Sequence, residues 1–220
     1  MAISKKLFAP AVMLFLCLLV LNPAPGRIFA SKDDTLSQLQ KDDWHEYFSN
    51  GGKEKLNRSF DELLELANNT GLDWHIRIRG IILLSETSDP RKADVFLGMF
   101  LNPLFNWECP AVKTSVVTAF GSVDKDPRIV DALIDGMNDR EVQVREAAIQ
   151  VLGRIGDEKA VPFLIKKLDD RSVAIRLSAI RSLGQIKDQR AVPFLKKIAD
   201  GDQDDLIRNE AASALTRMRS

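Results

Sequence analysis

Few residues in this 220-residue sequence have side chains suited to acid–base, nucleophilic or metal chemistry. There are two histidines, His45 and His75, and two cysteines, Cys17 and Cys109. A Ser-His-Asp or Cys-His nucleophilic site cannot be assembled from so few imidazoles and thiols, and the sequence has no glycine-rich phosphate-binding loop. The sequence therefore marks no catalytic centre, and it favours a protein that is not an enzyme.

Metal binding is disfavoured for the same reason. His45-Glu46 is a single pair of potential ligands, and His75 is followed by an isoleucine, whereas an iron site needs several imidazoles and carboxylates that converge. We expect no metal and no cofactor, with His45 exposed on a capping helix. The adjacent acids Asp42-Asp43 and Asp204-Asp205 fall in expected loops or helix starts, where carboxylates are favourable, so we interpret them as capping groups.

The first thirty residues have the organisation of a secretory signal. Lys5-Lys6 precede an apolar stretch of about fifteen residues, 7–21, and a Pro- and Gly-containing run then ends at Ala30. This stretch is shorter than the roughly twenty residues that span a bilayer. We expect cleavage after Ala30 and a periplasmic or secreted protein without stable membrane insertion; an uncleaved anchor is the alternative. Phe15-Leu16 before Cys17 disfavours a lipoprotein signal, which has small residues there.

The expected mature chain has one cysteine and a balanced charge. Cys109 can form no internal disulfide, and we interpret it as a small apolar filler rather than a reactive thiol. Three of the 31 basic residues lie in the first thirty positions, which leaves 28 against 31 acidic residues. This balance gives no electrostatic case for nucleic-acid binding.

A repeat organises the C-terminal half. Residues 160–164 recur identically as residues 191–195, thirty-one positions later, and the surrounding pattern has a period of 31 to 32 residues. Apolar residues also recur at the spacing of one helix face, and small residues in one column would let neighbouring helices approach closely. The columns are Val144, Ile175 and Ile207; Ala148, Ala179 and Ala211; Leu152, Leu183 and Leu215; and Ile155, Ile186 and Met218.

Each repeat is predicted to hold two helices. The shorter helix carries the Val-Pro-Phe-Leu block, with proline in its first turn, and turns at 156–157 and 169–170 separate the helices. We expect an all-α, right-handed α-solenoid of about five antiparallel helix pairs with an N-terminal helical cap. The expected parts are a signal peptide at 1–30, a cap and first helix at 31–70, and a repeat array at 71–220 that is clearest over 127–218. The segment 102–108 interrupts the register.

These repeats resemble the HEAT-repeat family, in particular the short bacterial variety named after phycobilisome lyases, whose units read Val-Arg-x-x-Ala-x-x-x-Leu-Gly-x-Ile. The resemblance implies a ladder of hydrogen bonds between neighbouring repeats, formed by an aspartate in the turn and an arginine six residues later. Trp107 and Gly71 replace the aspartate in the earlier units, so the ladder lapses there. The ladder pairs are Asp139 and Arg145, Asp170 and Arg176, and Asp202 and Arg208.

The resemblance also implies that the Val-Arg helices line a concave side that binds a protein partner. We expect the aromatic loop at Phe105 and Trp107 to form a second contact. The alternative for each exposed residue is an ordinary solvated helix face. Lys166-Lys167 and Lys196-Lys197 fall on the other helices, where we interpret them as solubilising charge. The implied partner-binding residues of the Val-Arg helices are Gln150, Arg154, Arg181, Gln185 and Arg217.

The leading functional hypothesis is an exported, monomeric scaffold that recruits a protein partner. The alternative is an enzyme or enzyme accessory of the lyase or oxidoreductase kind, because bilin lyases share this repeat type and a di-iron hydroxylase of deoxyhypusine shares the architecture; repeat type alone does not carry either activity over. A third hypothesis, a structural spacer, predicts a concave face without exposed apolar side chains.

Overall fold

The structure is a computed structural model that describes residues 59–103, 109–124 and 126–219. The expected signal peptide, the expected cap and the aromatic loop with Phe105 and Trp107 lie outside the described residues. All described residues belong to one compact unit, Glu54–Ser220, and its regular elements are all helical.

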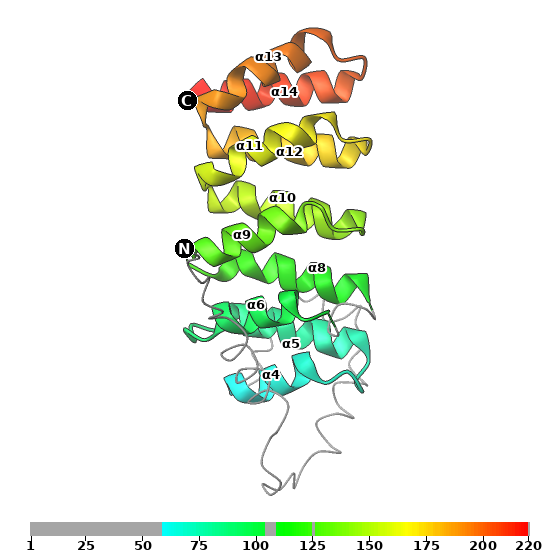
Figure 1. Ribbon diagram of the computed structural model, residues 1–220, viewed down its shortest axis with the longest axis vertical. Coiled ribbons are helices and arrows are strands. Elements are labelled where there is room, and N and C mark those ends of the chain that lie inside the picture. The colour runs from blue at the N-terminus through cyan, green and yellow to red at the C-terminus, as the bar shows by residue number, and fades with distance from the viewer. Residues whose placement is uncertain (1–58, 104–108, 125, 220) are drawn as a thin grey trace, which may run out of the picture. The chain divides into compact units, whose positions relative to one another are not determined.

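Ten α-helices of the described residues form five consecutive pairs, so the predicted α-solenoid of helix pairs is confirmed (Figure 1). Short 3-10 turns (Phe120–Ser122, Glu158–Ala160, Lys167–Asp169 and Gln189–Ala191) join or extend helices. The pairs are α4 (Phe60–Asn68) with α5 (Trp74–Glu86), α6 (Lys92–Leu101) with α8 (Pro110–Ala119), α9 (Pro127–Gly136) with α10 (Val142–Ile155), α11 (Val161–Lys166) with α12 (Val173–Ile186), and α13 (Val192–Gly201) with α14 (Asp205–Arg219).

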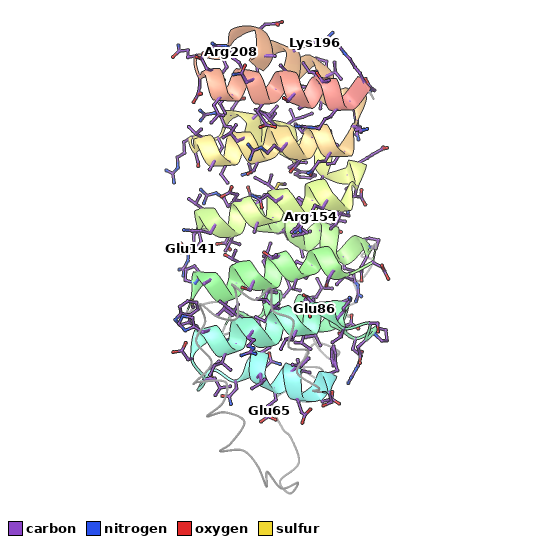
Figure 2. All side chains as sticks on the ribbon, turned by 180° about the vertical axis from the view of Figure 1, so that it is seen from behind. Glu65, Glu86, Glu141, Arg154, Lys196 and Arg208 are labelled. Atoms are coloured by element: carbon purple, nitrogen blue, oxygen red, sulfur yellow. The ribbon has the colours of Figure 1, made fainter. Side chains whose placement is uncertain are left out.

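The second helices of the five pairs stack side by side in one layer, in the order α5, α8, α10, α12 and α14 (Figures 1 and 2). The first helix of each pair packs against its own second helix. The predicted apolar columns lie in the core between these helices: Val144, Ala148 and Leu152 of α10 are fully buried, and so are their counterparts in α12. The repeat period thus fixes which side of each helix faces its neighbours.

Local signals set the ends of the helices. Ser59 and Glu62 form a capping box at the start of α4, which satisfies main-chain N–H groups that have no partner inside the helix. Prolines stand in the first turns of α8, α9, α11 and α13, where a missing N–H costs nothing. Gly156 ends α10 in the left-handed conformation with φ +73°, and Lys187 adopts the same conformation at the equivalent end of α12, with φ +61°.

Glycines bring neighbouring second helices close together. A Cβ placed on Gly153 of α10 would lie 2.7 Å from Cβ of Ser182 in α12, and one on Gly184 would lie 2.9 Å from Cβ of Ala214 in α14. The buried hydroxyl of Ser182 donates a hydrogen bond to the carbonyl of Ile149 across the same contact, at 2.8 Å. The Leu-Gly dipeptide of the repeat therefore marks the point where one repeat meets the next.

Within the described part of the chain, no helix is both long enough and apolar enough to cross a membrane.

Candidate partner-binding surface

The second-helix face is the set of exposed side chains on α5, α8, α10, α12 and α14. Figure 2 views the stack from behind and shows Arg154 where α10 lies next to α8. All five predicted partner-binding residues of the Val-Arg helices are exposed there, on α10, α12 and α14. The structure therefore places the predicted residues on three adjacent helices of one layer.

Three of these residues cover the glycine of the preceding helix. A Cβ on Gly121 would lie 3.1 Å from Nη2 of Arg154, and a Cβ on Gly153 would lie 2.5 Å from Oε1 of Gln185. Arg217 stands in the same relation to the next glycine, Gly184 of α12, with Nε 3.3 Å from the position of its Cβ. These side chains therefore form one row that crosses α10, α12 and α14. Each of them occupies the space that a glycine leaves open on the neighbouring repeat.

Two arginines of this face share one carboxylate. Nη2 of Arg181 lies 3.0 Å from Oε2 of Glu210, and Nη2 of Arg217 lies 3.0 Å from Oε1 of the same residue. Burial alone would raise the pKa of Glu210, but the hydrogen bonds from Arg217 and Arg181, together with their charges, hold it below its ordinary value. Glu210 is therefore ionised at neutral pH, and the three residues together carry a net positive charge.

Arg154 has a different environment from Arg181 and Arg217. Among the described residues, no group accepts a hydrogen bond or forms an ion pair with its guanidinium, and the side chain is exposed. It lines a hollow of about 230 Å³ at the turn between α8 and α9. The other lining residues are Gly121, Val123, Asp124, Asp126, Ile129 and Ile155. The carboxylate of Asp126 is already bound to Arg128, with Oδ2 2.7 Å from Nη2.

The remaining predicted residue, Gln150, belongs to a small polar network. Its amide donates to Oε1 of Glu146 at 3.2 Å, and the hydroxyl of Ser178 on α12 donates to the same oxygen at 3.1 Å. This network links α10 to α12 at the centre of the face.

Exposed apolar side chains stand in the first turn of four of the second helices. Trp74 of α5, Val142 of α10, Val173 of α12 and Leu206 of α14 are 43, 38, 40 and 54% exposed. Sequence analysis did not single them out, although each occupies one of the first two positions of its helix. Single exposed apolar side chains are ordinary on a protein surface, and Leu101, Phe163 and Phe194 are similarly exposed on the first helices, so these residues do not by themselves mark a contact surface.

The three Asp-Arg pairs of the expected ladder make hydrogen bonds, but with a geometry that differs from the expected one. Nη1 of Arg145 donates to the main-chain carbonyl of Asp139 at 2.9 Å, within its own repeat, and Arg176 and Arg208 reach the carbonyls of Asp170 and Asp202 in the same way. The aspartate carboxylates are occupied elsewhere, because each accepts the N–H two residues later.

A charged contact between repeats is made by Lys113, which occupies the repeat position equivalent to Arg145. The Asp-Arg sequence pattern lapses at this repeat. The ammonium group of Lys113 on α8 pairs with the carboxylate of Asp139, which precedes α10. Both side chains are largely buried, with 19 and 10% of their surfaces exposed. The lysine thus makes the inter-repeat pair that was expected of the arginines.

A second ladder, which sequence analysis missed, runs along the starts of the first helices. Each turn there reads Asp-x-Arg or Asp-x-Lys, and the basic side chain reaches back to the preceding repeat. Arg91 contacts Asp61 at 2.8 Å and Arg128 contacts Asp94 at 2.8 Å. Lys159 pairs with Asp131, and Arg190 donates to the carbonyl of Glu158 at 3.0 Å. We call these four contacts the first-helix ladder.

The aspartates of these turns are also bound within the turn. Hydrogen bonds from the side chains of Arg128 and Arg190 lower the pKa of Asp126 and Asp188 below the ordinary carboxyl value, and burial opposes the shift. The signal was present in the sequence as Asp89-Pro90-Arg91, Asp126-Pro127-Arg128, Asp157-Glu158-Lys159 and Asp188-Gln189-Arg190. A search limited to apolar columns does not find it.

The residues considered for catalysis or metal binding lie apart from this face's polar centre. His75 pairs with Asp73 at the start of α5, with Nδ1 2.6 Å from Oδ1, and Cys109 is a half-buried residue that precedes α8. Among the described residues, no three His, Cys, Asp or Glu side chains are grouped so that they could hold a metal ion. His45 lies outside the described residues.

The five helix pairs form an α-solenoid in which neighbouring repeats pack through their second helices. The row of exposed side chains crosses three of these helices. Residues 130–216 match the family model of HEAT repeats, so this part of the chain is built of HEAT repeats.

Among solved structures, the chain is similar to a chain of the complex of CpcE and CpcF of phycocyanin lyase from Nostoc sp. PCC7120. The TM-score is 0.62 at 19% sequence identity, and the similarity covers 76% of this chain and 67% of that chain. At this identity the likeness concerns the fold. No curated protein matches the sequence.

Proposed function

We propose that this protein is an exported scaffold that recruits a protein partner through its second-helix face. The observation that carries the proposal is the exposed row of Arg154, Gln185 and Arg217 across three consecutive helices. Arginine is enriched where proteins bind proteins, and apolar side chains lie exposed on the same helices. Repeat arrays offer extended surfaces of this kind.

The test is affinity capture with the full chain from its native envelope fraction. The variant replaces Arg154, Arg181 and Arg217 by glutamine together with Glu210→Gln, so that no carboxylate is left without its cations. It removes two net positive charges. The matched control, Lys196→Gln with Lys197→Gln, removes two charges from exposed positions on α13.

We expect one protein to be captured by the wild type and by the lysine control but lost with the arginine variant. Unchanged circular dichroism of the variant would show that its helices are intact. Capture that is equal for all three chains would contradict a role of this face.

Export is the second part of the proposal, and it is supported by the sequence of residues 1–30. We expect the protein recovered from the native host to begin at Ser31 and to be found outside the cytoplasm. N-terminal sequencing after cell fractionation tests this. A chain that keeps Met1 and stays in the membrane would favour an uncleaved anchor, and a cytoplasmic chain would contradict export.

The alternative function is that of an accessory to a lyase-type enzyme, for which the similar fold in a phycocyanin lyase complex is the supporting observation. Pigment that co-purifies in stoichiometric amount with the full chain, seen by visible absorbance, would favour it over the scaffold.

A further inference from the structure

The second-helix face has more cationic groups than carboxylates to balance them. Arg181 and Arg217 share the single carboxylate of Glu210, and Arg154 pairs with none of the described residues. These four side chains carry two net positive charges, and one remains when the carboxylate of Glu146 on α10, which accepts hydrogen bonds from Gln150 and Ser178, is also counted. An unbalanced cation on an exposed surface is best satisfied by a carboxylate from a partner, because bidentate arginine–carboxylate pairs are among the stronger charged hydrogen bonds.

The spacing of the row indicates how a partner must present its carboxylates. Packed helices lie about 8–10 Å apart, so Arg154 on α10 and Arg217 on α14 are separated by two such steps, or roughly 20 Å. An extended chain rises about 3.3 Å per residue, and six residues therefore cover the distance. Gln185 lies between the two arginines in the same row, and its amide can bind an uncharged polar group at the midpoint.

The ends of the row differ in what they offer. Val123, Ile129 and Ile155 line the hollow beside Arg154 together with Asp124 and Asp126, so the hollow itself suits an aliphatic stem, and a partner's carboxylate would bind the exposed guanidinium outside it. Arg217 is already paired with Glu210, but a guanidinium has five N–H donors and can hold a second acceptor. Arg154 should therefore contribute more to binding than Arg217.

We propose, resting on the scaffold function above, that the partner is an acidic segment in extended conformation, with two carboxylate side chains six residues apart on the same face of the chain and a main-chain peptide group beside Gln185 midway between them. It crosses α10, α12 and α14 with its acids on Arg154 and Arg217.

The probe is the peptide Gly-Glu-Ser-Ser-Gln-Ser-Ser-Glu-Gly, titrated into the isotopically labelled full chain at low salt and followed through the arginine Nε–Hε resonances by NMR. One control peptide has glutamine in place of both acids. The other has the same composition with its acids adjacent. We expect the spaced peptide to shift the resonances of Arg154 and Arg217 and to bind several-fold more tightly than either control.

Arg154→Gln should weaken binding of the spaced peptide by up to about five-fold, the upper end of the range for an exposed ion pair, while Lys196→Gln should leave it unchanged. High salt should abolish the difference between the spaced and neutral peptides, because exposed charges are screened. Equal affinity for all three peptides, no binding by the wild type, or an equal effect of the two substitutions would overturn the proposal.

The capture experiment separates this inference from the scaffold function. A protein captured through the arginine face, while the acidic peptides fail to bind, would leave the scaffold standing and remove the acidic segment. If no protein is captured through the arginine face and the acidic peptides also fail to bind, both the scaffold function and the acidic segment are contradicted.

Discussion

Replacing Gly153 by alanine would put a methyl group at the contact between α10 and α12. The new Cβ would lie 2.7 Å from Cβ and 2.6 Å from Oγ of Ser182. Because both Cβ positions are fixed by their backbones, no rotamer relieves the contact and the two helices must move apart. In an exposed helix, the same change would instead stabilise the fold.

The expected loss combines three effects. Overpacking a well-packed contact lowers the free energy of unfolding by about 1–3 kcal/mol. Stretching the hydrogen bond from the Ser182 hydroxyl to the carbonyl of Ile149 lowers it by about 1 kcal/mol more. The higher helix propensity of alanine raises the free energy of unfolding by about 1 kcal/mol, because alanine is favoured over glycine inside a helix. We therefore expect Gly153→Ala to lower the free energy of unfolding by about 1–3 kcal/mol.

Gly98 on α6 supplies the matched control, since none of the described residues has an atom within 4 Å of a Cβ placed there. Gly98→Ala should raise the free energy of unfolding by about 0.5–1 kcal/mol. Urea denaturation of the full chain, followed by circular dichroism, measures both. Opposite signs for the two substitutions support the close approach of the repeats, and stabilisation by both would refute it.

Three further predictions concern other contacts. Lys187→Gly should raise the free energy of unfolding by about 0.5–1 kcal/mol, because φ is +61° at Lys187; urea denaturation measures it, and a destabilised variant would contradict the strain. Lys113→Gln should lower the melting temperature, because it leaves the largely buried carboxylate of Asp139 without its cation, and adding Asp139→Asn should recover part of the loss; no recovery would contradict the pair. The pKa of Asp188 is lowered in the folded state by hydrogen bonds from Arg190, so its contribution is present above the ordinary carboxyl pKa of about 3.9 and is lost as the pH falls through the lowered value. Melting temperatures between pH 5 and pH 2 should therefore fall less steeply for Asp188→Asn than for the wild type, and parallel curves would argue against the linkage.

The repeat array could be predicted from the sequence because burial follows the apolar period directly. Val144, Ala148 and Leu152 are fully buried as the columns require, and a turn is present at Gly156, as predicted. Such features depend on one residue and its neighbours in the same repeat, so the sequence pattern is sufficient to find them.

Contacts between repeats were harder to predict, because they depend on which of several acceptors each cation reaches. Arg145 donates to the main-chain carbonyl of Asp139, while the carboxylate of Asp139 accepts from the N–H of Glu141 and pairs with Lys113. The first-helix ladder requires pairing across about thirty residues, as between Arg91 and Asp61, which the apolar columns do not indicate.

The sequence predicted which positions of the candidate site are exposed, but it did not predict how the charged side chains pair with one another. Sequence alone does not show that Arg181 and Arg217 converge on Glu210 while Arg154 pairs with none of the described residues. That difference depends on which carboxylate each guanidinium reaches on the neighbouring helix, which the sequence pattern does not specify.

Site-specific photo-crosslinking in the native host tests the central claim most directly. A photoreactive residue at Gln185 would lie in the middle of the row on the second-helix face, and one at Lys196 would lie exposed on α13. We predict one discrete crosslinked protein from position 185 that is absent from position 196 and is lost when Arg154 and Arg217 are replaced by glutamine. A crosslink from position 196 alone, or none from either position, would contradict partner binding through this face.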